Sequence, residues 1–407
     1  MPHETRQDRR PALGIARHGR LRKPNGVRTA VKALAAATAV VIASTGSVAA
    51  FAAWDLARTV QANSVDINDG QAPPPSIGGI DGGANVLLVG SDSRSGQGDG
   101  YGDLRKVGGS DNNDVTMLLH ISEDHTRATV VSFPRDMLID RPACPASGTS
   151  PGGVAASGAE MNSALSKGGL DCVVRTVESI TGLDIPYGGV VQFTGVIAMS
   201  NAVGGVTVCL ANPIKDKNTD LNLGAGPQLL QGETAVQFLR TRYGIGDNSD
   251  IDRISNQQVF LSALVRTITS GDTLTNPAKL YGIARAAVEN MSLSTSLDDP
   301  TAIASLALTL KGIPLDRFVF VQYPSTRLES GRVAQDIEGG TRMMQLIADD
   351  ADFSLAPDST GAGVEAPPAD AAPADPGTPA ADPSPAAVLP SNATGQTAAA
   401  ETCSNAR

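Results

Sequence analysis

The sequence predicts an α/β sandwich over roughly residues 84–356, and three observations lead to it. Apolar runs rich in Val, Leu and Ile alternate with longer amphipathic stretches, which is the pattern of strands that alternate with helices. Several of the runs are apolar without interruption, as is typical of strands that are buried on both faces. No internal repeat is visible, so the segment is expected to form one domain.

The individual elements follow from the same two patterns. Apolar runs predict strands at 85–89, 114–121, 128–133, 206–210 and 317–322. Amphipathic stretches predict helices at 170–181, 193–203, 232–239, 251–270, 277–290, 301–311 and 340–348. Polar side chains at the ends of these strands are candidates for a functional site, because ligands of α/β proteins bind at strand ends.

The amino-terminal region predicts a membrane anchor. Residues 1–32 carry seven Arg and two Lys against only Glu4 and Asp8, and the 22 residues 33–54 carry no charge. A helix that crosses a bilayer needs about 20 apolar residues, so 33–54 is expected to be a transmembrane helix behind a cytoplasmic basic segment. A cleavable signal peptide is the alternative, because Ser47-Val48-Ala49-Ala50 offers the small residues that a signal peptidase accepts.

The anchor implies a location. Basic residues on one side of a span stay in the cytoplasm, so the chain beyond Asp55 is expected outside the cell, on a single-pass cell-membrane protein. The net charge is −10 in spite of the basic arm, so the exported part is strongly acidic. No electrostatic footprint for nucleic acid is present, and DNA or RNA is excluded as an expected partner.

Two further segments are expected to lack a packed core. Residues 55–83 contain three consecutive prolines and several glycines, which predicts a flexible stalk. Residues 357–407 are rich in Ala, Pro, Asp, Ser and Thr and contain no aromatic residue, which predicts a disordered tail.

The four cysteines all lie beyond the predicted span, where an oxidising environment permits disulfides. One bridge is expected among Cys144, Cys172 and Cys209, with Cys144–Cys172 the first choice and Cys172–Cys209 the second. Cys403 falls in the predicted tail. The sequence contains no CxxC or paired His/Cys spacing, which argues against a zinc site.

Two carboxylates stand at the edges of predicted strands. Asp92 follows the strand in NVLLVGSDSR, with Arg94 two residues later, and Asp114 stands at the entrance of the strand in NDVTMLLHI. A carboxylate at a buried strand is costly unless it is paired or bound to metal. Together they predict an oxygen-ligand site for magnesium and phosphate, with Asp103 and Asp111 as competing ligands. A plain turn after a strand is the structural alternative for Asp92.

Arginines dominate the next two clusters. Pro134 stops the strand in VVSFPRD and makes Arg135 available, although an Arg-Asp pair after a strand often only ties a loop together. The segment 235–258 then concentrates Arg240, Arg242 and Arg253 in an acidic chain. If the helix ends near residue 239, the two arginines at 240 and 242 share one face of an extended chain. Several guanidiniums presented together match the oxygens of a pyrophosphate.

These motifs, in this order, resemble the LytR-CpsA-Psr family of cell-wall glycopolymer transferases, in the style of its actinobacterial members. The matching pieces are LLVGSDSR, DVTMLLHI, SFPRD, MNSALSKGG, NAVGGV and LRTRYGIGDNSDIDRISNQQ, which span roughly residues 84–270. The resemblance implies a three-layer α-β-α sandwich with a mixed central sheet. It departs from the family where Asn112-Asn113-Asp114 replaces a frequent Arg-Ser-Asp, so one expected phosphate-binding cation is missing unless Arg94 or Lys106 replaces it.

The resemblance also implies roles for the residues. Asp92 and Asp114 would hold Mg²⁺ as the cofactor. Arg94, Arg253 and Gln257 would bind the pyrophosphate. The catalytic group would consist of Arg135, Arg240, Arg242 and Asp250, with Asp250 or a metal ligand accepting a proton.

The implied reaction transfers a glycopolymer from a polyprenyl-pyrophosphate carrier to peptidoglycan at the membrane. The apolar faces of residues 193–203 and 259–268 would line the polyprenyl pocket, unless they are ordinary core. Two alternatives use the same residues: a wall regulator that binds polyprenyl phosphate without turnover, and a hydrolase of polyprenyl pyrophosphate.

Overall fold

A computed structural model describes residues 26–62, 64–67, 82–93, 111–147, 150–246, 250–270, 273, 276–297, 300–356, 359–361, 363–365 and 387–405. Residues 26–54 and residues from Asp55 onward fall into two units, which we describe separately.

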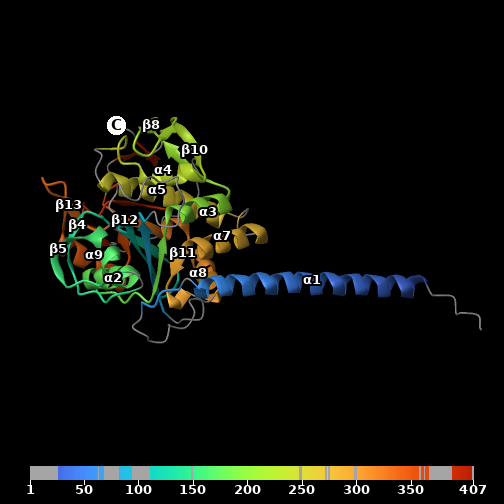
Figure 1. Ribbon diagram of the computed structural model, residues 1–407. Helices are drawn as coiled ribbons and strands as arrows, with labels where there is room; N and C mark the ends of the chain where they lie inside the picture. The colour runs from blue at the N-terminus through green and yellow to red at the C-terminus, as the bar shows by residue number, and fades with distance from the viewer. Residues whose placement is uncertain are drawn as a thin grey trace, which may run out of the picture. The chain divides into compact units, whose positions relative to one another are not determined.

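A mixed seven-stranded sheet forms the centre of the larger unit (Figure 1). Its strands, in spatial order, are β11 (Met291–Leu293), β6 (Tyr187–Val191), β1 (Ala84–Ser91), β2 (Asn113–Ile121), β3 (Ala128–Phe133), β12 (Phe318–Gln322) and β18 (Gly395–Thr397). Strands β1 and β6 run parallel, as do β3 and β12, while the remaining neighbours are antiparallel. The α/β prediction with a mixed sheet is therefore confirmed.

Helices cover both faces of this sheet because its central strands alternate apolar side chains toward each face. On one face, Leu118 and Val131 share a core with helices α2 (Ala164–Thr181) and α9 (Ile337–Ala348). On the other face, Phe318 and Phe320 share a second core with α8 (Pro300–Gly312) and part of α5 (Asp250–Thr269). The arrangement gives three layers, helix, sheet and helix.

A third apolar core lies under a smaller sheet of order β10-β7-β19-β16. Its elements are β10 (Gly226–Leu230), β7 (Val206–Leu210), β19 (Cys403–Ser404), β16 (Val364–Glu365), the hairpin β8 (Ile214–Asp216) and β9 (Leu221–Leu223), α3 (Phe193–Val203), α4 (Glu233–Arg240) and α7 (Pro277–Asn290). Helix α5 contributes to this core and also to the core under the central sheet, so it connects the two layers.

The remaining strands form two small sheets. One has the order β13 (Ser325–Arg327), β14 (Val333–Gln335), β4 (Met137–Arg141) and β5 (Ala156–Glu160). The other pairs β15 (Phe353–Ser354) with β17 (Ala387–Val388). All five predicted strands and all seven predicted helices exist, most with shifts of one to three residues, whereas α2 begins six residues before its predicted start.

The smaller unit contains most of helix α1 (Gly26–Ala62), which covers the charge-free run and extends beyond it at both ends. Among the helices of the described residues, none is both long enough and apolar enough to count as a candidate membrane span. The transmembrane helix predicted at 33–54 is therefore not supported. Most of the predicted basic segment, residues 1–25, lies outside the described residues.

The predicted stalk at 55–83 is ordered wherever the structure describes it. Its first part continues α1 as far as Ala62. Val65 then pairs with the main sheet, donating to the Leu293 carbonyl at 2.8 Å and accepting from the Thr295 amide at 2.9 Å, and Ile67 is buried in the core. The apolar residues Val65 and Ile67 find partners on the sheet edge, which the glycine and proline content of the segment concealed.

The predicted disorder of the tail at 357–407 is wrong for residues 387–405. Strand β18 adds an edge to the central sheet beside β12, and β19 inserts beside β7 in the smaller sheet. The apolar and small side chains Leu389, Ala393 and Ala398 are buried there. A segment rich in Ala and Pro has little apolar surface with which to form its own core. Here these residues pack instead against a core that other segments of the chain form.

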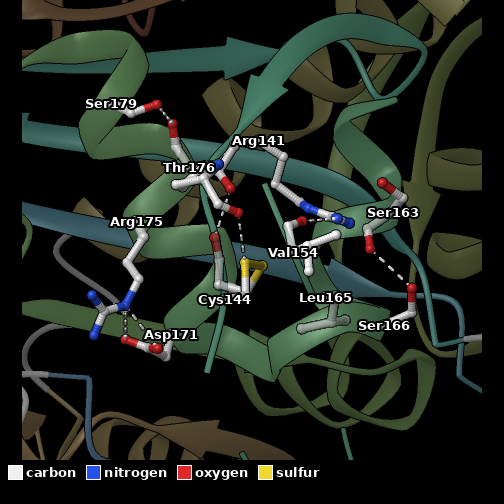
Figure 2. Close-up of a disulfide and its surroundings, with 12 residues drawn as sticks. Arg141, Cys144, Val154, Ser163, Leu165, Ser166, Asp171, Arg175, Thr176 and Ser179 are labelled. Atoms are coloured by element: carbon white, nitrogen blue, oxygen red, sulfur yellow. Dashed lines mark hydrogen bonds and ion pairs between the residues drawn. A yellow bond between two sulfur atoms is a disulfide. The ribbon is translucent and has the colours of Figure 1, made fainter. Parts of the chain in front are cut away.

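All four cysteines form disulfides. The predicted bridge between Cys144 and Cys172 is confirmed, and Figure 2 shows it where helix α2 faces the segment that follows β4. A Cβ atom on Gly168 would lie 2.8 Å from the Cβ of Cys172 and 2.9 Å from that of Cys144, so the glycine in MNSALSKGG makes room for the bridge. The alternative partner Cys209 pairs instead with Cys403, 194 residues later.

Candidate active site

The polar residues singled out in the sequence gather around one cavity of about 310 Å³. Strands β1 and β2 form one side of it, and helices α3, α4 and α5 form the other. The predicted site residues that line it are Asp114, Arg135, Arg240, Arg242, Arg253 and Gln257. Arg94 and Lys106 lie outside the described residues.

Asp114 and Arg135 meet where two neighbouring strands of the central sheet begin and end. Asp114 is the second residue of β2, and Arg135 follows β3 after Pro134, as the sequence predicted. One guanidinium nitrogen of Arg135 donates to Oδ1 of Asp114 at 2.7 Å. Antiparallel pairing of β2 with β3 puts the start of one strand beside the end of the other, which explains the contact.

Asp250 lies outside the cavity lining and contacts two of the arginines, Arg135 and Arg253. Its Oδ2 accepts from the backbone amide of Arg135 at 3.0 Å, and its Oδ1 lies 2.6 Å from a guanidinium nitrogen of Arg253. Arg253 also donates to the backbone carbonyl of Asp114 at 2.9 Å. The Asp250 side chain is only 3% exposed and does not line the cavity, so it is placed to position Arg135 and Arg253.

Arg240 and Arg242 come from the end of α4 and the loop after it. The helix ends at Arg240, one residue after its predicted end, and Thr241 is extended with φ −60° and ψ 131°; both arginines line the cavity. The guanidinium of Arg240 lies over the ring of Phe193, 4.5 Å from its centroid. Arg242 lies 3.7 Å from Oδ2 of Asp136, a longer separation than those of Arg135 and Arg253 from their carboxylates.

The electrostatics differ along this group of arginines. Burial alone would lower the pKa of Arg135, but Asp114, Asp250 and Asp136 together raise it above its ordinary value. Burial, followed by the nearby Arg135 and Arg253 guanidiniums, lowers the pKa of Arg242. Arg242 is therefore positive charge that the protein's own carboxylates compensate incompletely, which favours an anionic ligand beside it.

Gln257 lies on α5 one turn after Arg253, and its amide donates to the Leu239 carbonyl at 3.2 Å. It lines the cavity and is 4% exposed. The contact joins α5 to the end of α4 directly beside Arg240. Gln257 therefore contributes to the cavity wall and to the position of that arginine.

Asp92 follows β1 and does not line the cavity directly. Its Oδ1 accepts from the Asn112 amide at 2.9 Å. Burial raises the pKa of Asp92, and the negative charge of Asp114 raises it further. Asn113, one of the residues at the departure from the family pattern, is fully buried and ties the start of β2 to α2, accepting from the Leu165 amide at 3.1 Å.

The two carboxylates fit a magnesium site that substrate oxygens complete. Within the described part of the chain, no group of three His, Cys, Asp or Glu side chains could hold a metal by itself. Magnesium, however, commonly uses one or two carboxylates together with water and phosphate oxygens. After burial, the negative charge of Asp114 is among the causes that raise the pKa of Asp92, and Asp114 lines the cavity.

The other walls of the cavity are apolar. Leu88, Met117 and Val115 come from the sheet, and Val196 and Leu261 come from α3 and α5. Each of the two segments predicted to line a lipid pocket, 193–203 and 259–268, thus contributes to the wall, while others of their residues, such as Val203 and Val259, are ordinary core. The cavity joins an apolar chamber to a set of guanidiniums.

Sequence reasoning missed one buried acid of this site. Asp216, at the end of β8, is 1% exposed and lines the cavity. Its Oδ2 accepts from the backbone amides of Arg242 and Tyr243 at 3.2 and 3.1 Å, and its Oδ1 accepts from Asn218 at 2.8 Å. β8 has only three residues, so no strand pattern drew attention to its last residue.

Known proteins resemble this chain in sequence. The LytR_cpsA_psr family model matches residues 42–350. The cell wall biosynthesis protein LcpA of Corynebacterium glutamicum is 31% identical over 289 residues, which are 65% of this chain and 52% of that protein. TagT of Bacillus subtilis, named a polyisoprenyl-teichoic acid–peptidoglycan teichoic acid transferase, is 27% identical over 308 residues, 73% of this chain and 87% of that protein.

Solved structures show the same fold. The crystal structure of B. subtilis TagV matches with a TM-score of 0.50 at 22% identity, covering 66% of this chain and 98% of that chain. A LytR-Csp2A-Psr enzyme from Actinomyces oris matches with a TM-score of 0.50 at 19% identity, covering 70% and 94%. The chain spans about half the length of LcpA and of a second C. glutamicum relative, LcpB. Because the family model covers most of the chain, the protein belongs to the LytR-CpsA-Psr family.

Proposed function

We propose that the protein transfers a glycopolymer from a polyprenyl-pyrophosphate carrier to peptidoglycan. The observation that carries the proposal is the cavity that joins apolar walls to Arg135, Arg240, Arg242 and Arg253. A polyprenyl pyrophosphate has the same division, an apolar chain ending in a doubly phosphorylated group. TagT is named for the transfer of polyisoprenyl-linked teichoic acid to peptidoglycan, and this supports the same reaction class.

The covalent step exchanges one P–O bond for another. A sugar hydroxyl of peptidoglycan attacks the phosphorus atom that carries the glycan, and the bond from this phosphorus to the bridging oxygen breaks. Polyprenyl phosphate leaves, and the hydroxyl loses its proton. Negative charge grows on the leaving and the equatorial oxygens, where fixed guanidiniums stabilise it more in the transition state than in the ground state.

Each arginine contributes to this stabilisation in its own way. Arg135 and Arg253 are fixed by Asp114 and Asp250, so they hold their positions without a ligand. Arg242, whose pKa is lowered by burial and by its arginine neighbours, gains most from a phosphate nearby. Arg240 is oriented by the ring of Phe193.

The proton of the attacking hydroxyl goes to a carboxylate. Asp250 was the first candidate from the sequence, but it lies behind the wall of the cavity and its oxygens face Arg135 and Arg253. The alternative, a carboxylate at the proposed metal site, fits better because Asp114 lines the cavity, within reach of a bound hydroxyl. We therefore assign the proton to the edge formed by β1 and β2.

We propose Mg²⁺ as the cofactor, held by Asp92 and Asp114. When bound, it neutralises charge on the pyrophosphate oxygens. The support is that burial, and after it the negative charge of Asp114, raise the pKa of Asp92, and that Asp114 lines the cavity.

We also propose that the larger unit acts outside the cell at the membrane. The two disulfides support an oxidising compartment. Protease treatment of intact cells tests the location: the larger unit should be degraded while a cytoplasmic marker survives, and equal protection of both would contradict it.

The test of the reaction uses the full chain in detergent with a polyprenyl-pyrophosphate glycan, Mg²⁺ and peptidoglycan. A covalent glycan–peptidoglycan product, detected by mass spectrometry, is expected from the wild type and not from the Arg240→Ala, Arg242→Ala double variant. Arg285→Ala is the matched control, because Arg285 pairs with Glu289 on the surface of α7 and is 52% exposed.

Other outcomes separate the alternatives. Lipid binding by the wild type without any product would favour a polyprenyl-phosphate-binding regulator. Release of the phosphorylated glycan into solution in the absence of peptidoglycan, at the rate of transfer in its presence, would favour a hydrolase.

A further inference from the structure

The loop that carries Arg242 also presents an aromatic ring to the solvent. Tyr243 is 55% exposed and lines the cavity, so its ring lies at the opening rather than in the interior. Its exposure is not a sign of a loose loop. Thr241 and Ile245 on either side of it are both fully buried.

The backbone of this loop is held on two sides. Asp216 accepts from the Tyr243 amide at 3.1 Å, and a Cβ atom on Gly244 would lie 2.9 Å from the Lys215 carbonyl oxygen. Gly244 has φ +111°, a conformation that favours glycine. The chain therefore packs closely against β8 around the exposed ring, which fixes the position of Tyr243 at the opening of the cavity.

Hydrogen-bonding side chains accompany the ring. Asn218 is exposed and lines the cavity, and its backbone amide donates to Oδ1 of the same Asp216 at 2.8 Å. Thr219 also lines the cavity, and its hydroxyl lies 3.0 Å from that of Thr241. One buried carboxylate thus organises Arg242, Tyr243 and Asn218 at once.

We propose that Tyr243, Asn218 and Thr219 form a binding subsite for a sugar ring, with Asp216 as its positioning residue. A pyranose has an apolar face of C–H groups, which packs on an aromatic ring, and hydroxyls around its edge, which bond to amide and hydroxyl groups. The subsite rests on the proposed function, because the neighbouring Arg242 would hold the phosphate next to the bound sugar. The sugar can belong to the donor glycan or to the peptidoglycan acceptor, which share this chemistry.

The test compares Tyr243→Ala and Tyr243→Phe with the wild-type full chain by calorimetry. The probes are a polyprenyl pyrophosphate bearing one N-acetylglucosamine, a sugar-free polyprenyl phosphate, and soluble peptidoglycan fragments. Tyr243→Ala should weaken one sugar-bearing probe by about tenfold and leave the sugar-free lipid unchanged, while Tyr243→Phe keeps most of the affinity. Loss for the first probe identifies a donor subsite, and loss for the third identifies an acceptor subsite.

Asp216→Asn and Ile337→Ala complete the design. Asp216→Asn should weaken the same sugar-bearing probe as Tyr243→Ala, while Ile337→Ala, which removes an exposed apolar side chain of α9, should bind every probe like the wild type. Unchanged binding of both sugar-bearing probes by Tyr243→Ala, or an equal loss for the sugar-free lipid, would overturn the subsite. These measurements do not depend on turnover, so an inactive wild type would contradict the proposed function and still decide this inference.

Discussion

Two pairs of arginines share the cavity but are held in opposite ways. Arg135 and Arg253, the carboxylate-paired arginines, lie 2.7 Å and 2.6 Å from the oxygens of Asp114 and Asp250. Arg240 and Arg242, the loop arginines, come from the end of α4 and the loop after it, where Arg242 lies 3.7 Å from a carboxylate oxygen of Asp136. A group of like charges can thus contain some members that the protein's own carboxylates fix and others whose charge a ligand compensates.

The two ways of holding an arginine follow from how deeply each side chain is buried. A buried arginine without a partner would be expensive, so the most buried one, Arg253 at 5% side-chain exposure, takes the closest carboxylate. Arg242, at 29% exposure, tolerates a weaker partner and has a lowered pKa. We therefore expect that removing a carboxylate-paired arginine destabilises the fold, and that removing a loop arginine impairs the reaction.

The largest effect is expected from Arg253→Ala. The change leaves the buried Asp250 without its closest cation, and breaking a buried pair costs about 3–5 kcal/mol of unfolding free energy. Urea denaturation measures it, with Arg285→Ala as the surface control expected to cost about 0.5 kcal/mol. A loss no greater than that of the control would show that Arg253 is not structurally paired, and the comparison would fail.

Arg242→Ala should give the converse result. Transfer should fall by about 10²–10³-fold in kcat, as when one fixed donor to a transition-state charge is removed. The free energy of unfolding should stay within about 1 kcal/mol of the wild type, because the side chain is partly exposed and its pKa is lowered rather than raised. Initial rates and urea curves on the same preparation check both parts, and a loss of stability as large as that of Arg253→Ala would remove the distinction.

Removal of the Cys209–Cys403 bridge should affect the loop arginines through a longer connection. Beside the bridge, the Ser404 hydroxyl lies 2.6 Å from Oδ1 of Asn256, whose amide nitrogen donates to the Phe238 carbonyl near the end of α4. Cys209→Ser with Cys403→Ser should lower the unfolding free energy by about 2–4 kcal/mol. Hydrogen exchange should rise at residues 238–246 more than around Arg135, and uniform exchange across the unit would contradict this path.

The smallest effect is expected from the Asp92 carboxylate. Burial raises the pKa of Asp92 above its ordinary value of 3.8, so its contribution to stability is complete below that value and is lost as the pH rises through the folded-state pKa. Asp92→Asn should remove this part of the fall in stability on raising the pH in metal-free buffer. It should also weaken Mg²⁺ binding by about tenfold or more. Thermal unfolding with and without Mg²⁺ across pH 4–7 checks both, and unchanged magnesium stabilisation would exclude Asp92 as a ligand.

The sequence predicts much of this site because its residues lie beside long elements. Strand β3 and helix α3 have the predicted bounds, and Arg135 and Phe193 adjoin them. The sequence did not indicate Asp216 as a site residue because β8 has only three residues. Its role also depends on backbone amides of a loop that comes later in the chain. The order of residues 387–405 was not predicted because these residues are buried against other segments of the chain. Cys403 was the one sequence feature that indicated a contact there.

Strand β18 completes the edge of the central sheet, and β19 stands between β7 and β16. Both strands are translated long after the strands β12 and β7 beside which they pair. A ribosome must therefore synthesise the region around residues 395–404 before either sheet is complete, and Cys209 has no disulfide partner until Cys403 is made. The order of synthesis thus delays completion of both sheets until nearly the whole described chain is present.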